Sequence, residues 1–447
     1  MVAVFVLPLL AGAASAPPKA IVLMLGDDYG YNNVGFAHGP RGEDFGDGNP
    51  EMRTPHMDAH ARAGIVLDRV YVYKYCSPTR SSLMSGRVPP RVNQNNKNND
   101  LEATSGPDLR FKLLPAKMKE AGYATAFVGK SHLGARSPGN LPINRGFDYH
   151  FGFLKGGEDH YNQGSGNVGH YLTGKTVDLW NNHALANYTG IYSGYLYTEQ
   201  AVGVIENFTS TVARMTAPGV SKEVAAAAPK GLFLYLAWHN THTPLECPPE
   251  WMYPSLPSYN NSFGARMTYN CMARILDDGV NNVTQALIKA DLWKDAIMFF
   301  AADNGGWAHT TGSNNYPLRG SKTSDFEGGI RAVSWIDGGY LPANVRGGVH
   351  SGYIAIADWY GTLCNMVGVD PTDNVHGLPP VESNDFWPSI LTPNATSSGR
   401  DEIFLAWSCA PPSSNVTGCD PKAKSIYNSR CAKRTNAFSY KMLLPPP

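Results

Sequence analysis

The stretch "KAIVLMLGDDYG" (19–30) decides the fold, because a run of strand-forming residues ends abruptly in two acidic residues. Six consecutive apolar residues suit a strand of a parallel sheet that is covered on both faces. Three later runs have the same character, and each also ends in polar residues. The four runs are AIVLML (20–25), ATAFVG (124–129), LFLYLAW (232–238) and AIMFFAA (296–302). They predict the central strands of one sheet.

Helix-like segments alternate with these runs. Residues 113–123 end in a glycine stop, and apolar residues recur with helical period through 269–293. Alternation of strands and helices predicts an α/β fold, a large, mixed but mostly parallel sheet sandwiched by helices. In such sheets ligands bind beyond the carboxyl ends of the strands, where the polar residues fall.

Composition limits the partners. The chain has 447 residues, 37 basic and 37 acidic side chains and 43% hydrophobic residues. A net charge of zero gives no electrostatic reason to expect nucleic acid or an anionic membrane as a partner. After the first residues no segment is long and apolar enough to predict a membrane span.

The N-terminus and the sequons predict export. Residues 1–16, MVAVFVLPLLAGAASA, are apolar and end in small residues, which favours a cleaved signal peptide over a buried first strand. Basic residues, usual in a signal peptide, are missing from it. The secretory pathway, with a lysosomal or extracellular destination, is the predicted location. Six N-x-S/T sequons agree with this prediction. They lie at Asn187, Asn207, Asn260, Asn282, Asn394 and Asn415.

The chain divides into a large domain and a small one. We expect a catalytic domain over 17–375 and a small C-terminal subdomain over 376–447, where the composition turns to Pro, Ser and Cys. Two strand-like runs, 402–408 and 438–444, predict a short antiparallel sheet in this subdomain. Residues 155–197 are expected to form long loops, and 217–230 a surface insertion.

Acidic and amide residues follow the first and last of the four runs. Either cluster alone is typical of a turn. Together Asp27, Asp28, Asp303 and Asn304 offer an all-oxygen ligand set with three formal negative charges. Those charges would repel one another at the end of a sheet unless a cation joined them. Oxygen ligands favour Ca²⁺ or Mg²⁺ over zinc.

The stretch "YCSPTRSSLMSGR" (75–87) reads as the start of a helix that ends at a glycine. Pro78 suits the first helical turn. Cys76 would then lie at the helix N-terminus, where the dipole lowers a thiol pKa and backbone N–H groups favour anions. The alternative is that Cys76 is one half of a disulfide. An exported chain with seven cysteines can pair six of them and leaves at least one without an internal partner.

Basic and imidazole side chains occur after the other strands and in a glycine-rich segment. Each alone is typical of a solvated or structural residue. Converging on a hard metal and a helix N-terminus, they would form a pocket for an oxyanion such as sulfate or phosphate. These residues are Arg80, Lys130, His132, His239, His242, Arg319, Lys322 and Arg331. The pattern indicates a hydrolase or transferase that acts on an anionic ester.

Several blocks resemble the type I sulfatases. CSPTR (76–80) matches the C-x-P-x-R motif, and GDDYG, GKSHLG, HNTHTPL, ADNGG and PLRGSKTSDFEGGIR resemble other blocks in the family's order. The segment 145–161, RGFDYHFGFLKGGEDHY, is most similar to the arylsulfatase B branch, which includes N-acetylgalactosamine-4-sulfatase. The resemblance covers residues 20–392 and implies an alkaline-phosphatase-like fold.

The resemblance also implies roles. A formylglycine-generating enzyme would oxidise Cys76 to Cα-formylglycine, whose hydrate attacks sulfur with one hydroxyl and expels sulfate with the other, through a formylglycine-sulfate intermediate. Asp27, Asp28, Asp303 and Asn304 resemble Ca²⁺ ligands, with the residue-76 oxygen beside them. Arg80 and His132 would hold the formylglycine. Lys130 and Lys322 would bind sulfate oxygens, and His242 would protonate the leaving alcohol. His239 would be a structural or substrate-rim residue.

The sequence departs from the family at three places. Ser131 replaces an aromatic residue, 88–98 replaces a usual block after the nucleophile helix, and the C-terminal subdomain is expected to be shorter than in many relatives. None of these removes a catalytic group. The substrate would be a sulfated small molecule or glycan.

Two alternatives stay open. One is a phosphodiesterase or phosphonate hydrolase of the alkaline-phosphatase superfamily, against which the cysteine and the absence of histidine metal ligands count. The other is a non-catalytic binder of sulfated glycans. With Cys76 oxidised, six cysteines remain for up to three bridges, and Cys409 and Cys419 are plausible partners.

Overall fold

A computed structural model describes residues 16–37, 52–92, 106–164, 177–251, 261–373, 375–393, 395–408 and 438–443. Its fifteen named strands are β1 (Ala20–Gly26), β2 (Ile65–Leu67), β3 (Val70–Tyr71), β4 (Tyr123–Gly129), β5 (Tyr149–Gly152), β6 (Trp180–Asn181), β7 (Ala184–Leu185), β8 (Gly231–Ala237), β9 (Ala296–Ala302), β10 (Arg331–Ala332), β11 (Ser334–Asp337), β12 (Gly348–His350), β13 (Ile354–Ala355), β14 (Glu402–Ser408) and β15 (Phe438–Leu443).

Ten α-helices are defined in the described part of the chain. They are α1 (Pro55–Ala63), α2 (Cys76–Ser85), α3 (Leu114–Glu120), α4 (Ser193–Met215), α5 (Lys222–Ala226), α6 (Asn261–Lys289), α7 (Ala308–Thr311), α8 (Glu327–Ile330), α9 (Asp358–Met366) and α10 (Trp387–Ile390). Among them, none is long and apolar enough to cross a membrane, as far as the described residues go.

A ten-stranded sheet forms the centre, in the order β12-β2-β11-β9-β1-β8-β4-β5-β6-β7. The four predicted strands, β9, β1, β8 and β4, are neighbours and run parallel. Nearly every residue in them is buried, as continuous apolar runs require. The pairs β9–β11, β2–β11, β5–β6 and β6–β7 are antiparallel. The predicted mixed, mostly parallel α/β sheet is therefore confirmed.

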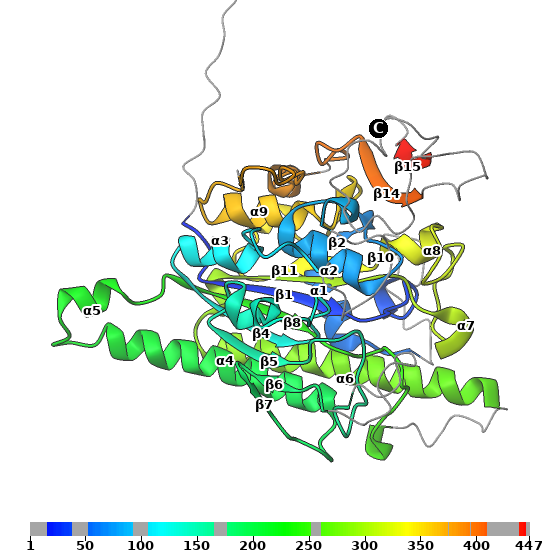
Figure 1. Cartoon of the computed structure of the whole chain (residues 1–447), viewed down its shortest axis with the longest axis horizontal. Helices are drawn as coiled ribbons and strands as arrows, with labels where there is room; N and C mark the ends of the chain where they lie inside the picture. Colours follow the sequence, from blue (N-terminus) through cyan, green and yellow to red (C-terminus); the bar gives the residue numbers. More distant parts are fainter. Residues whose placement is uncertain are drawn as a thin grey trace, which may run out of the picture.

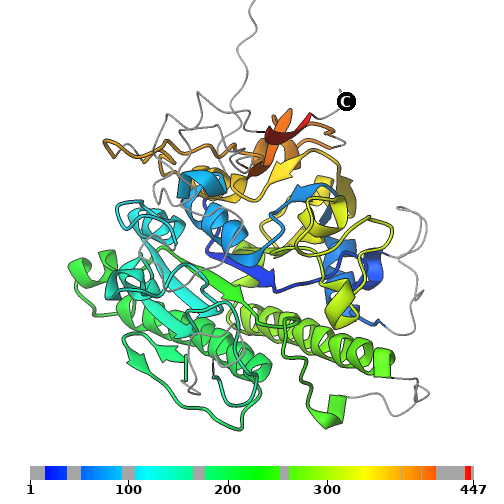
Figure 2. The same cartoon turned by 45° about the vertical axis from the view of Figure 1, so that its right-hand side comes forward.

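Helices cover both faces of this sheet (Figure 1). The long helices α4 and α6 pack against each other on one face. On the opposite face α2, α3 and α9 contact one another. A second view shows the same arrangement, with β14 and β15 beyond the α9 side of the molecule (Figure 2). The sandwich places the carboxyl ends of the parallel strands at one edge.

The segments outside the central strands agree with the sequence in most places, but the loops predicted over 155–197 are wrong where β6, β7 and the start of α4 lie. A three-stranded sheet, β10-β3-β13, lies beside α2, and β14 pairs with β15 in antiparallel orientation, as predicted for the C-terminal runs. The division into domains at residue 375 stays a prediction. The insertion at 217–230 is largely exposed and holds the short helix α5. The expected signal peptide lies almost entirely outside the described residues.

The structure gives the pairing state of four of the seven cysteines. Cys247 and Cys271 form a disulfide that ties the loop after β8 to α6. Cys76 and Cys364 are buried and unbridged. The suggested pair Cys409 and Cys419 lies outside the described residues. Three sequon asparagines, Asn187, Asn207 and Asn282, are exposed, whereas Asn260, Asn394 and Asn415 are not described.

Candidate active site

The polar residues that follow the four parallel strands meet at one edge of the sheet. Strand register aligns Gly26 with Ala302, and Leu25 and Gly129 with Ala237. The residues that come next, Asp27, Asp303, Lys130 and the 238–242 loop, therefore emerge side by side. The sequence argument from strand ends predicted this meeting, and the side-chain contacts below bear it out.

Three carboxylates lie at the centre of the site and are completely buried. The backbone N–H of Asp28 donates to Asp303 Oδ1 at 3.1 Å, and Asn304 Nδ2 donates to Asp28 Oδ1 at 2.8 Å. Asp28 has a φ of 55°, an uncommon backbone conformation for a residue other than glycine. Burial and the charge of Asp27 raise the pKa of Asp303. The four predicted metal ligands are thus in one cluster.

Three cationic side chains balance these carboxylates. Lys130 Nζ lies 2.6 Å from Asp27 Oδ2, and Lys322 Nζ lies 2.7 Å from Asp28 Oδ2. Arg80 donates from Nε and Nη2 to Asp303 Oδ2 at 3.0 and 2.8 Å, and from Nη1 to the Lys130 carbonyl. Burial opposes the ionisation of Asp28, but Lys322 and His242 outweigh it and lower its pKa.

Two buried acceptors indicate room for a cation. Asp27 Oδ1 and Asn304 Oδ1 receive no hydrogen bond from any described residue, although Arg80 Nη2 lies 3.7 Å from the former. A buried acceptor without a donor is costly, and a hard cation satisfies it. Ligand atoms of Asp27, Asp28, Cys76 and His242 lie within 4.8 Å of one another. This group shares Asp27 and Asp28 with the predicted set, whose all-oxygen donors would suit a calcium-like ion.

Cys76 is the first residue of α2, as predicted, and its side chain is 1% exposed. Its sulfur lies 3.9 Å from Asp28 Oδ1. The helix ends at Gly86, which adopts the left-handed conformation. The expectation of a lowered thiol pKa is wrong, because burial and the charge of Asp303 raise the pKa of Cys76 instead. An unmodified Cys76 would therefore be a poor thiolate nucleophile.

His242 and His239 are in contact. His239 Nε2 lies 3.2 Å from His242 Nδ1, which also lies 2.7 Å from the Thr243 carbonyl. The carbonyl can only accept, so His242 Nδ1 carries a hydrogen and Nε2 faces Asp28, 3.8 Å from Oδ2. His239 is completely buried, which favours the structural role over the substrate-rim role among the two that were predicted. It contacts His242 at Nδ1, the ring nitrogen other than the one that faces Asp28.

His132 is buried and has a φ of 53°. A Cβ on Gly156 would lie 2.7 Å from its Cε1 atom, so the glycine makes room for the imidazole ring. The neighbouring Ser131 is also buried, and its hydroxyl has no hydrogen-bond partner among the described residues. Ser131 is therefore buried even though it is smaller than the aromatic residue that is usual at this position in the family.

Two supporting residues were missed from the sequence. Gly156 is one, and Trp307 is the other, because Lys322 Nζ lies 5.3 Å from the centre of its ring. Trp307 follows the ADNGG block directly, which could have signalled it. Arg319 and Arg331 do not join the carboxylate cluster. Arg319 stacks on Phe326, and Arg331 pairs with Asp68 and Glu327.

Comparison with known proteins gives the family. The sequence profile of the family described as Sulfatase matches residues 19–369, most of the chain. The chain therefore belongs to the Sulfatase family. Mouse (Mus musculus) arylsulfatase J is 32% identical over 390 residues, which are 85% of this chain and 57% of that protein. The chain thus spans little more than half the length of this relative.

Other relatives agree with that family. Mouse (Mus musculus) N-acetylgalactosamine-6-sulfatase is 29% identical over 403 residues, covering 86% of this chain and 68% of that protein. The crystal structure of Ps i-CgsB in complex with k-i-k-neocarrahexaose aligns with a TM-score of 0.69 and 25% identity, over 87% of this chain and 80% of the other. These relatives do not specifically support the arylsulfatase B branch.

Proposed function

We propose that the protein hydrolyses sulfate esters at the cluster around Cys76. One observation carries the proposal, namely that an unbridged, buried cysteine begins a helix beside three carboxylates, three cations and His242. Helix N-termini and cationic side chains both favour an oxyanion. Membership of the Sulfatase family makes sulfate the favoured anion.

Two groups would complete the site. Asp27, Asp28, Asp303 and Asn304 would hold Ca²⁺, which neutralises and orients an oxyanion as a Lewis acid. Cys76, oxidised to formylglycine by a formylglycine-generating enzyme, would supply paired hydroxyls for attack on sulfur and release of sulfate, as in the formylglycine-sulfate mechanism of the family. Asn304 would have to turn its amide so that Oδ1 faces the cation, and this turn would break the Nδ2 hydrogen bonds to Asp28 Oδ1 and to the Gly305 carbonyl.

The chain's own residues have distinct tasks. Lys130 and Lys322 form ion pairs with Asp27 and Asp28, two of the carboxylates that would bind the cation. Because the cation would replace the ammonium groups as the partner of these carboxylates, both lysines would become available to bind sulfate oxygens. Hydrogen bonds from all three of its guanidinium nitrogens fix the position of Arg80, which would hold residue 76 together with His132. To protonate the leaving alcohol from Nε2, His242 would first have to become the imidazolium, because its neutral form carries its hydrogen on Nδ1 and burial and Lys322 lower its pKa.

The substrate class is a sulfated carbohydrate or a small aryl sulfate. Relatives named for both kinds support it, since N-acetylgalactosamine-6-sulfatase and arylsulfatase J both match. The block 145–161 still supports the arylsulfatase B branch as a proposal. Secretion or lysosomal delivery is proposed from the Cys247–Cys271 disulfide and from three exposed sequon asparagines.

The step that releases sulfate from the protein distinguishes a sulfatase from the alternative, a phosphodiesterase or phosphonate hydrolase. Cys76→Ser keeps one hydroxyl for attack but lacks the second that would expel sulfate. We expect it to take up sulfate once, accumulate as the sulfated protein and stop turning over. Asp303→Ala should instead lose metal and fail before any sulfate is transferred.

Both variants should be assayed on matched aryl sulfate and aryl phosphate after chelation, with Ca²⁺ or Zn²⁺ restored. The wild type should prefer sulfate and recover with Ca²⁺. Sustained turnover by Cys76→Ser, or recovery with Zn²⁺ together with a preference for phosphate, would favour the phosphatase alternative. Binding of sulfated glycans without any turnover by the formylglycine form would favour a non-catalytic binder.

A further inference from the structure

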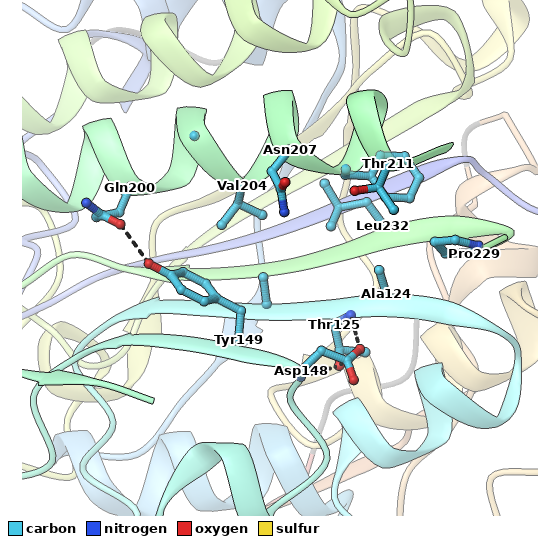
Figure 3. Close-up of a pocket in the computed structure, with 13 residues that line it drawn as sticks. Ala124, Thr125, Asp148, Tyr149, Gln200, Val204, Asn207, Thr211, Pro229 and Leu232 are labelled. Atoms are coloured by element: carbon cyan, nitrogen blue, oxygen red, sulfur yellow. Dashed lines mark hydrogen bonds between the residues drawn. The ribbon is translucent and has the colours of Figure 1, made fainter. Parts of the chain in front are cut away.

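A groove of about 530 Å³ lies between α4 and the strands beneath it, and none of its lining residues belongs to the Cys76 cluster. Figure 3 shows α4 along one wall and β4, β5 and β8 along the other. Leu232, Phe208 and Val204 supply apolar surface, and the Tyr149 hydroxyl donates to Gln200 Oε1 at 2.7 Å across one end. Its volume is in the range of small-molecule sites.

The helix face that borders the groove is unusual. Residues 200, 203, 204, 207, 208 and 211 of α4 line it, and this spacing is one continuous stripe of a helix. A stripe that faces a sheet is normally apolar. Here it includes Gln200, Asn207 and Thr211, and Gly203 has nothing within 4 Å of where a Cβ would lie. Both walls of the groove therefore carry apolar and polar side chains, with Thr125 and Asp148 on the strand side, and such a mixture suits a sugar.

Asn207 lies at the middle of this stripe. It is exposed, and its side-chain amide points from α4 into the groove (Figure 3). It also begins the sequon Asn207-Phe208-Thr209. A sugar on its Nδ2 would therefore start inside the groove, whereas the exposed sequon asparagine Asn282 lies on α6, outside the groove lining.

We propose that Asn207 carries an N-linked glycan whose first N-acetylglucosamine occupies this groove. The inference rests on the proposed export of the chain. In the transfer, Asn207 Nδ2 bonds to the anomeric carbon of a polyprenyl-pyrophosphate-linked oligosaccharide, the carbon–oxygen bond to pyrophosphate breaks, and the amide loses one proton. The sugar ring would pack on Tyr149 and Phe208, and its hydroxyls would meet Gln200 and Thr211.

The test uses the full chain secreted from a eukaryotic host. One portion is trimmed with an endoglycosidase that leaves a single N-acetylglucosamine, and another is stripped with an amidase that removes it. The trimmed protein should keep the thermal midpoint of the untreated protein. The stripped protein should melt about 2–4 °C lower and bind an apolar dye. Native amidase release should be slower at Asn207 than at Asn187 or Asn282, because the linkage lies within the groove.

Matched variants sharpen the result. The amidase leaves aspartate at each site, so Asn207→Asp should reproduce the stripped protein. The neutral Asn207→Gln should show the same lowered midpoint, and Asn187→Gln and Asn282→Gln should not. Adding Gly203→Leu to Asn207→Gln should fill the groove and restore the lost midpoint. Glycans at other sequons but none at Asn207, or equal midpoints for trimmed and stripped protein, would overturn the proposal while export stands. A secreted chain without any N-glycan would overturn both. An apolar small molecule co-purifying in the groove of the glycosylated protein would also overturn it.

Discussion

Two buried clusters of charged side chains border the central sheet, and they differ in how completely their polar atoms are paired. The active-site cluster around Asp27 and Asp303 leaves two buried acceptors without donors among the described residues. The second, which we name the His60 cluster, consists of His60, Thr284, Asp337 and Arg346. In it His60 Nδ1 lies 2.8 Å from Asp337 Oδ2, and Nε2 lies 3.0 Å from Thr284 Oγ1.

The pairing in the His60 cluster continues outward. Arg346 Nη1 donates to Asp337 Oδ1 at 3.0 Å, and Thr284 Oγ1 donates to the Val280 carbonyl at 2.8 Å. The residue types resemble a hydrolytic triad. Their polar side-chain atoms, however, are hydrogen-bonded to one another or to other described residues of the protein. Fully paired buried networks stabilise a fold, whereas unpaired acceptors in a charged cluster mark a place for a ligand. This difference supports the proposed ligand site in the Asp27 cluster and a structural role for the His60 cluster.

The largest expected effect comes from Asp27→Asn. The substitution keeps the shape of the side chain but removes the charge of a proposed metal ligand, so aryl sulfate turnover should fall by about 10²–10³-fold or more. In chelator its unfolding free energy should fall by about 3 kcal/mol, because buried Lys130 loses the charge of the carboxylate that lies 2.6 Å from it. Added Ca²⁺ should raise the melting temperature of the wild type and leave the variant unchanged. An active variant that still gains stability from Ca²⁺ would contradict the assignment.

The same substitution in the His60 cluster should lower stability without lowering turnover. Asp337→Asn replaces one acceptor oxygen with an N–H₂ group that faces His60 or Arg346, so we expect a loss of about 3 kcal/mol in unfolding free energy. Turnover per folded molecule should stay within a factor of about two of wild type. Urea denaturation with parallel activity assays measures both. Lost turnover in a fully folded variant would show that this cluster also serves catalysis.

A smaller effect is expected from Gly156→Ala. The added methyl group would push against the His132 ring, and we expect turnover to fall by about tenfold through misplacement of a group that holds residue 76. Gly203→Ala is the matched control, since its Cβ meets open space. Kinetics of both variants at the same glycosylation state test the contact. Equal turnover for the two would contradict a catalytic use of the His132 position.

The smallest effect is expected at Ser131. Its buried hydroxyl makes no hydrogen bond within the described residues, so Ser131→Ala should leave unfolding free energy unchanged or raise it by up to about 1 kcal/mol. Ser85→Ala, in contrast, removes a donor that bonds the Ser81 carbonyl at 2.6 Å and should destabilise slightly. Denaturant midpoints of the pair provide the measurement. A marked loss in Ser131→Ala would reveal a partner for its hydroxyl.

The sequence predicted the central strands closely, because continuous apolar runs that end in polar residues are characteristic of buried parallel strands. Their bounds agree with the structure to within about a residue, and the helix after Cys76 begins where its proline indicated. Parallel strands carry their following residues to one edge, so the meeting of Asp27, Lys130, His242 and Asp303 could also be anticipated.

Other features depend on contacts between distant segments. The room that Gly156 leaves for His132, the contact of His239 with His242 and the pairing in the His60 cluster have no local sequence signal. The Cys76 thiol shows the same limit. The helix position alone indicated a lowered pKa, but the burial that raises it arises only when the whole chain has folded.

The mass of the peptide that contains residue 76 tests the account most directly. The protein should be produced in cells with a formylglycine-generating enzyme, shown to turn over an aryl sulfate, and then digested under non-reducing conditions. Our account predicts an aldehyde or its hydrate in place of the Cys76 thiol, in a fraction that follows specific activity across preparations. Active protein whose Cys76 is wholly unmodified, or joined in a disulfide, would contradict it.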